Sequence, residues 1–90
     1  MDHERLFRRF LERKKQQAER RGDGRTVDAI EHVLHDELMF CGLCCESVVA
    51  CTSQRGRLFG QFEFLRYLLE NWQTILENIL KLIDLFSGTD

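Results

Sequence analysis

Apolar residues between positions 58 and 86 recur at alternating steps of four and three without a break. They are Leu58, Phe62, Leu65, Leu69, Trp72, Leu76, Ile79, Ile83 and Phe86. This spacing is typical of the apolar seam of a long helix that packs against other helices, as in a coiled coil. The pattern therefore predicts one helix over about 58–86.

A second seam with the same spacing precedes the first. Its positions are Val27, Ile30, Leu34, Glu37, Cys41, Cys44, Val48 and Cys51. From Leu38 onward the other sides of this segment are also mostly apolar, which indicates a helix that is buried on every face. The seam predicts a helix over about 26–53 with Thr26 as its N-cap. The connection to 58–86 is short, so the two helices should form an antiparallel hairpin.

The pattern in the first segment, 1–21, predicts a basic amphipathic helix. Its apolar residues, Leu6, Phe7, Phe10 and Leu11, fall on one side of a helix, and Gly22 and Gly24 mark its end. The opposite side forms a basic patch of Arg5, Arg8, Arg9, Arg13 and Lys15. The whole chain, 1–90, then reads as a single all-α domain of three helices, in which 26–86 is the hairpin core.

The hairpin carries more apolar surface than its two seams can cover. Leu68, Ile75 and Leu82 form a second apolar row, and the first helix offers few large apolar residues to cover it. Exposing several such side chains costs about 1.5–3 kcal/mol each. We therefore expect a homodimer that completes a helical bundle. The expected oligomer interface comprises Leu68, Ile75, Leu82, Met39 and Leu43; the orientation of the two copies stays open.

The net charge of −2 hides a split along the chain. Residues 1–25 hold nine Lys and Arg against five Asp and Glu, whereas residues 26–90 hold four against ten. The basic first helix could bind nucleic acid or an anionic membrane surface. We favour instead that it docks on the body through Leu6, Phe7, Phe10 and Leu11, with its charges facing water or an acidic stripe. That stripe consists of Glu63, Glu70, Glu77 and Asp84, which recur every seven residues. No apolar run is long enough to span a bilayer and the charged start is unlike a signal peptide, so we expect a cytoplasmic protein.

Four cysteines, Cys41, Cys44, Cys45 and Cys51, lie within eleven residues of the second predicted helix. We interpret them as small buried residues that let helices pack closely. The alternatives are a thiol site for zinc or copper, with Glu37 as a further candidate ligand, and a redox or inter-subunit disulfide.

Glu37 breaks an otherwise apolar seam, and in an antiparallel hairpin it comes opposite Trp72 and Gln73. A buried carboxylate there is either a register-setting polar residue, which we favour, or a functional group with a raised pKa. A separate polar face holds Asp28, His32, His35 and Asp36, which we interpret as a solvated face rather than a metal site.

No phosphate-binding loop, nucleophile–base pair or zinc-peptidase motif is present in the sequence. We therefore predict that the chain is not an enzyme and needs no cofactor. The sequence favours a small interaction or regulatory module that acts through self-association and helix-face contacts with a protein partner. Two alternatives stay open: a thiol-based metal-binding protein that uses zinc or copper, and a nucleic-acid-binding protein that uses the basic first helix.

Overall fold

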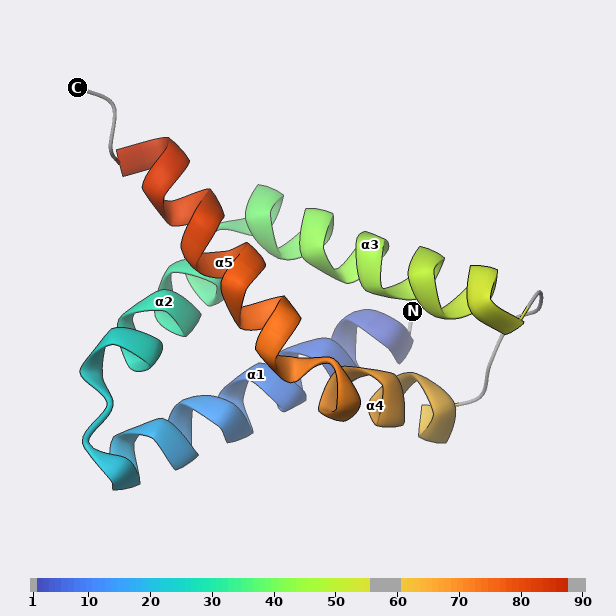
Figure 1. Ribbon diagram of the computed structural model, residues 1–90, viewed down its shortest axis with the longest axis horizontal. Coiled ribbons are helices and arrows are strands. Elements are labelled where there is room, and N and C mark those ends of the chain that lie inside the picture. Colours follow the sequence, from blue (N-terminus) through green and yellow to red (C-terminus); the bar gives the residue numbers. More distant parts are fainter. Residues whose placement is uncertain (1, 56–60, 88–90) are drawn as a thin grey trace.

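The computed structural model describes residues 2–55 and 61–87, and within these ranges the chain forms helices and no strands (Figure 1). The helices are α1 (Asp2–Arg21), α2 (Gly24–His35), α3 (Glu37–Arg55), α4 (Gln61–Glu70) and α5 (Trp72–Ser87). The all-α prediction is confirmed. The predicted count of three helices is not, because each of the two long predicted helices is divided into two.

The bounds of α1 agree with the sequence pattern, and its end has a clear cause. Gly22 adopts a positive φ of 76°, a conformation that costs glycine little. The Gly22 N–H donates to the Glu19 carbonyl at 3.1 Å and the Asp23 N–H donates to the Ala18 carbonyl at 2.9 Å, which together satisfy the last turn of the helix.

Asp23, not Thr26, is the N-cap of α2. Its carboxylate accepts a hydrogen bond from the Thr26 N–H at 3.2 Å and another from the Thr26 hydroxyl at 2.6 Å. These hydrogen bonds hold the pKa of Asp23 below its usual value. The helix therefore starts at Gly24, two residues before the predicted boundary.

The predicted 26–53 helix is broken at Asp36. The Asp36 N–H still donates to the His32 carbonyl at 3.0 Å, but the backbone of Asp36 is extended, with φ −109° and ψ 102°. Its carboxylate oxygen Oδ1 then accepts from the Leu38 N–H at 3.1 Å and the Met39 N–H at 3.2 Å. One side chain thus caps the start of α3 directly after the end of α2.

The break changes the position of Glu37. Because the chain turns at Asp36, Glu37 becomes the first residue of α3 and is exposed to solvent. The predicted burial of Glu37 opposite Trp72 is wrong. The Trp72 ring packs against Phe10 instead, with the ring centroids 5.3 Å apart.

The predicted 58–86 helix bends at Asn71. The Asn71 side-chain amide donates to the Tyr67 carbonyl at 3.0 Å, and the Asn71 backbone N–H donates to the same oxygen at 3.0 Å. A side chain that competes for a helix carbonyl is a recognised cause of bending. Figure 1 shows that α4 and α5 run in different directions on either side of this residue.

The core includes the apolar side of α1. Phe7, Phe10 and Leu11 are buried there, and Phe7 packs against Phe40 of α3 with ring centroids 5.2 Å apart. Every other helix contributes buried residues to the same cluster: Ile30 and Val33 from α2, Met39, Phe40 and Leu43 from α3, Phe64 and Leu68 from α4, and Ile75 and Ile79 from α5. The basic helix therefore docks into the shared core through its apolar side, as the sequence predicts.

The side of α4 that faces the core is not the side that carries the predicted seam. Leu68 of the second row is fully buried, whereas Phe62 and Leu69 of the predicted seam are 87 % and 54 % exposed. Leu58 of the same seam lies outside the described residues.

The residues expected at an oligomer interface lie inside one chain. Met39, Leu43, Leu68 and Ile75 are buried, and Leu82 is half-buried. These residues therefore leave no exposed apolar row for a second subunit to cover. The argument from the sequence for a dimer interface at these positions does not hold. In the described part of the chain, no helix is both long and apolar enough to cross a membrane.

Candidate functional site

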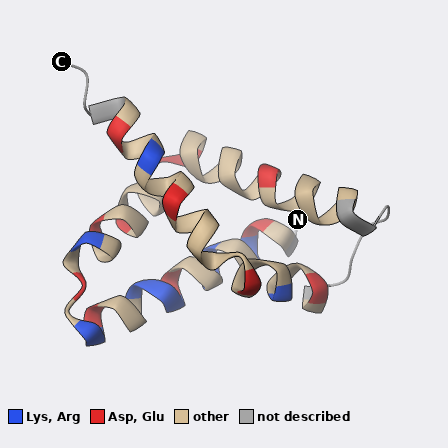
Figure 2. Ribbon diagram, viewed as in Figure 1, with Lys and Arg blue, Asp and Glu red and all other residues tan. Residues whose placement is uncertain are grey.

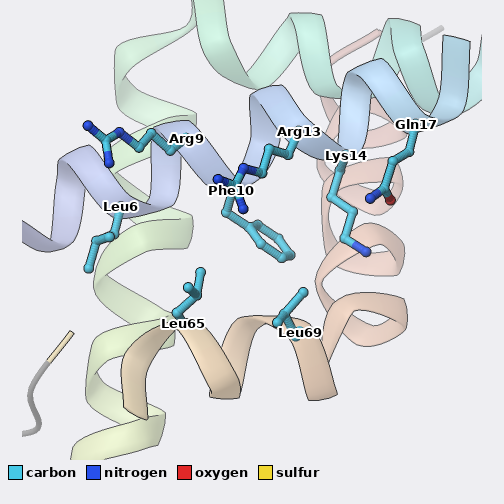
Figure 3. A pocket seen from close by; sticks show the side chains of 8 residues that line it. All are labelled: Leu6, Arg9, Phe10, Arg13, Lys14, Gln17, Leu65 and Leu69. Carbon is cyan, nitrogen blue, oxygen red and sulfur yellow. The ribbon is translucent and has the colours of Figure 1, made fainter. Parts of the chain in front are cut away.

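A groove with an apolar floor lies between α1 and α4 (Figure 3). Leu6 and Phe10 of α1 face Leu65 and Leu69 of α4 across it, and the groove encloses about 160 Å³. Phe10 is buried at its base, whereas Leu6 and Leu65 are half-buried and Leu69 is more than half exposed. A cavity of about 150 Å³ can hold a benzene-sized group. The groove can therefore take one large apolar side chain.

Positive charge follows the α1 side of this groove. Arg9, Arg13 and Lys14 line it together with Gln17, and all four come from α1 (Figure 3). Among the described residues, neither Arg9 nor Arg13 lies within 4 Å of a carboxylate. Two guanidinium groups beside the groove thus have no anionic partner within the described chain.

Lys14 is held over aromatic rings at the same site. Its ammonium lies 5.3 Å from the centroid of the Trp72 ring and 5.7 Å from that of the Phe10 ring. Burial, and secondarily the charge of Arg21, lower the pKa of Lys14. A carboxylate that entered the groove would offset both effects and would favour the charged lysine.

The basic patch predicted from the sequence is divided between different surfaces. Arg9 and Arg13 line the groove, but the Arg8 guanidinium lies 4.6 Å from the centroid of the Phe40 ring. The Lys15 ammonium lies 3.0 Å from a Glu31 carboxylate oxygen, a contact that raises the pKa of Lys15. Arg5 is exposed. Figure 2 shows the positive residues of α1 spread along the length of the helix.

The residues of the acidic stripe are on α4 and α5. Glu70, Glu77 and Asp84 are exposed, and Glu63 is half-buried. Glu70 pairs with Arg66 of its own helix at 3.6 Å. Both side chains of that pair are largely exposed, so it adds little stability.

A second hollow, of about 230 Å³, lies between the start of α1 and the side of α3. Its lining is mostly apolar and includes three thiols, those of Cys41, Cys44 and Cys45; the other lining residues are His3, Glu4, Val48 and Val49. Cys41 and Cys45 are exposed, whereas Cys44 and Cys51 are buried. The interpretation of the cysteines as buried packing residues therefore fits only two of them.

Within residues 2–55 and 61–87, no three His, Cys, Asp or Glu side chains are arranged as metal ligands would be. The candidate ligands Cys41, Cys44, Cys45, Cys51 and Glu37 accordingly form no such group, although Cys41, Cys44 and Cys45 line the same hollow. Of the polar face on α2, Asp28, His32 and His35 line a shallow open depression with Glu31, while Asp36 is the α3 cap.

The thiols should differ in their reactivity. Burial, and then the neighbouring Cys45, Glu4 and Cys41, raise the pKa of Cys44 to about 11. At pH 8 only about 0.1 % of such a thiol is the reactive thiolate, and the fraction rises about tenfold per pH unit. We expect iodoacetamide at pH 8 to modify Cys41 and Cys45 well before Cys44, as measured by tandem mass spectrometry of the 26–55 peptide.

The control for this prediction is the unfolded chain in guanidinium chloride, where the four thiols should react at similar rates. Equal modification of Cys44 and Cys41 in the folded protein at pH 8 would contradict the burial of Cys44.

The arginines of the groove can be recognised in the sequence, but the groove itself cannot. Leu65 and Leu69 were assigned to a seam that faces another helix of the hairpin, and nothing in their spacing pairs them with α1. Comparison with protein-family models, curated proteins and solved structures finds no match to this chain.

Proposed function

We propose that the chain is a small non-catalytic interaction module that binds an acidic amphipathic helix of a partner protein in the groove between α1 and α4. The supporting observation is an apolar floor of Leu6, Phe10, Leu65 and Leu69 beside a cationic rim of Arg9, Arg13 and Lys14. A helix that lays its apolar side into a groove is a recurrent mode of peptide recognition.

The dimensions of the groove define the ligand. Leu6 and Gln17 lie eleven residues apart on α1, so the lined part of the helix is about 16 Å long. This length matches about three turns of a ligand helix, with one large apolar side chain directed into the groove between Phe10 and Leu69. Asp or Glu beside this anchor would face Arg9 and Arg13.

The apolar floor favours a protein ligand over nucleic acid. A phosphate backbone could pair with the arginines, but it would leave Leu69 uncovered. Burying large apolar side chains contributes about 1.5–3 kcal/mol each, which only a ligand with apolar groups can gain. We also propose a cytoplasmic location, since four thiols within eleven residues suit a reducing compartment.

The experiment is a selection from a displayed library of helical peptides, in which rim positions can be acidic, basic or neutral. We expect the selected peptides to share one large apolar residue with Asp or Glu beside it on the same side of the helix. Fluorescence anisotropy should then show that Leu69→Asp weakens binding by at least about tenfold. Arg9→Glu with Arg13→Glu should reverse the preference from acidic to basic peptides.

Two matched controls test whether the groove is responsible. Phe62→Asp changes an exposed apolar residue of the same helix outside the groove. Arg5→Glu with Arg20→Glu makes the same change in net charge on exposed α1 positions outside the groove. Both variants should bind as the unaltered chain does. Selected peptides without an acidic preference would overturn the proposal, as would heparin or DNA binding that needs Arg9 and Arg13 when no apolar peptide is selected.

A further inference from the structure

One face of α3 is apolar, uncharged and turned to solvent. Leu38 is 87 % exposed and Val49 is 62 % exposed, and Cys41, Gly42 and Cys45 are exposed between them. On a helix with 3.6 residues per turn these five positions fall on one side. The only charged residue from 38 to 49 is Glu46, which lies at the edge of this face. We call these five residues the α3 face.

The α3 face has a projecting residue at one end and a hollow near the other. Leu38 projects at the start of the helix, whereas the hollow reaches Val49 at the other end of the face. The hollow is lined by Cys41, Cys44, Cys45, Val48 and Val49 of α3 and by His3 and Glu4 of α1. Leu38 and Val49 are eleven residues apart, or about 16 Å along the helix. The hollow encloses about 230 Å³, and its lining is mostly apolar, which suits a leucine side chain.

Between the two ends the face is lined by small residues. Gly42 is exposed, and a side chain added there would meet nothing within 4 Å, so packing inside the chain does not require glycine. A glycine within a helix costs about 1 kcal/mol relative to alanine. Gly42, together with Cys41 and Cys45 beside it, forms a shallow surface onto which another helix can pack closely.

We infer that the α3 face binds the α3 face of a second copy of this chain in an antiparallel, two-fold symmetric dimer. A two-fold axis near Leu43 and Cys44 brings Leu38 of each copy to the hollow of the other. The same operation sets Cys41 opposite the partner's Cys45. An isologous contact of this kind requires one surface to be complementary to itself, and the leucine and hollow on one face provide that.

The charges support this orientation. In the antiparallel register Glu37 comes opposite the partner's Val49 and Glu46 comes opposite the partner's Phe40 or Cys41, so neither of these α3 carboxylates faces its own counterpart. Glu4 is the one carboxylate in the lining of the hollow. A parallel pair would instead set Glu46 against the partner's Glu46. An uncharged face also needs an uncharged partner surface, and the same face of a second copy is one. This inference does not depend on the groove between α1 and α4.

A single helix pair gives a small interface, so we expect a weak dimer with a Kd in the micromolar range or above. Sedimentation equilibrium of the full chain in reducing buffer should show a mass that rises from one copy toward two with concentration. Leu38→Asp removes both projecting leucines of the dimer and should weaken association by about 100-fold or more. Phe62 on α4 is as exposed as Leu38, and the Phe62→Asp variant should associate as the unaltered chain does.

The register is tested with two variants that each keep one cysteine, Cys41 or Cys45, the others being alanine. Diamide takes two electrons and two protons from a pair of thiols as their disulfide forms. A mixture of the two variants should cross-link much faster than either alone, since like cysteines are about 6 Å out of register. A chain that stays monomeric at millimolar concentration would overturn the inference. So would Leu38→Asp associating normally, or like cysteines cross-linking as fast as the mixture.

Discussion

Replacing Phe7 with alanine should lower the free energy of unfolding by about 3–5 kcal/mol, the usual cost of deleting a buried aromatic side chain. Phe7 is fully buried, and its ring packs against that of Phe40 on α3. A chain of 90 residues has a total stability of about 5–13 kcal/mol. The substitution should therefore remove a large part of it, as measured by urea unfolding followed by circular dichroism.

The matched control is Arg5→Ala, an exposed position two residues away on the same helix, which should change stability by no more than about 0.5 kcal/mol. The result distinguishes two views of the first helix. If 26–86 were a self-sufficient hairpin core, losing Phe7 would cost less than about 1 kcal/mol and the remaining helices would unfold as before. Such a result would contradict the contribution of Phe7 to the shared core.

Local signals in the sequence were sufficient to predict the first helix. Leu6, Phe7 and Phe10 give one apolar side, and Gly22 supplies the conformation that ends the helix. These features act over a few residues, so they can be recognised without knowledge of the tertiary structure. The all-α class follows in the same way from helical spacing along nearly the whole chain.

The breaks at Asp36 and Asn71 were not predicted because no proline or glycine marks them. Each depends on a polar side chain that bonds to nearby backbone, and such residues also occur on the exposed side of continuous helices. The regular spacing through Glu37 and Trp72 favoured continuity. Once the chain turns at Asp36, the residues after it point in new directions, and Glu37 becomes exposed.

The candidate site was predicted only in part, for a related reason. The arginines could be found because charge is a property of composition. The groove requires that α4 lie beside α1, and this contact depends on the two unpredicted breaks. The exposed face of α3 was not predicted for the same reason. The regular spacing through Cys41 placed that residue in a buried seam, whereas the break at Asp36 leaves it exposed.

Replacing Leu68 with aspartate should unfold the chain. Leu68 is fully buried between helices of one copy, and a carboxylate at this position would have no charged partner in the described core. Burying an unpaired charge costs several kcal/mol, in addition to about 1.5–3 kcal/mol for the lost apolar burial. The sum approaches the total stability, so the helical signal at 25 °C and the cooperative thermal transition should both be largely lost.

Leu69→Asp is the control, because this neighbour on the same helix is 54 % exposed and lies at the groove. It should keep its helical signal and shift Tm by only a few degrees, since a change of about 1 kcal/mol moves the Tm of a domain this size by about 4–8 °C. A dimer interface at Leu68 would give the opposite pattern for Leu68→Asp, namely a folded monomer with a normal helical signal. The two neighbouring substitutions thus test whether Leu68 completes the core of one chain or forms an interface with a second copy.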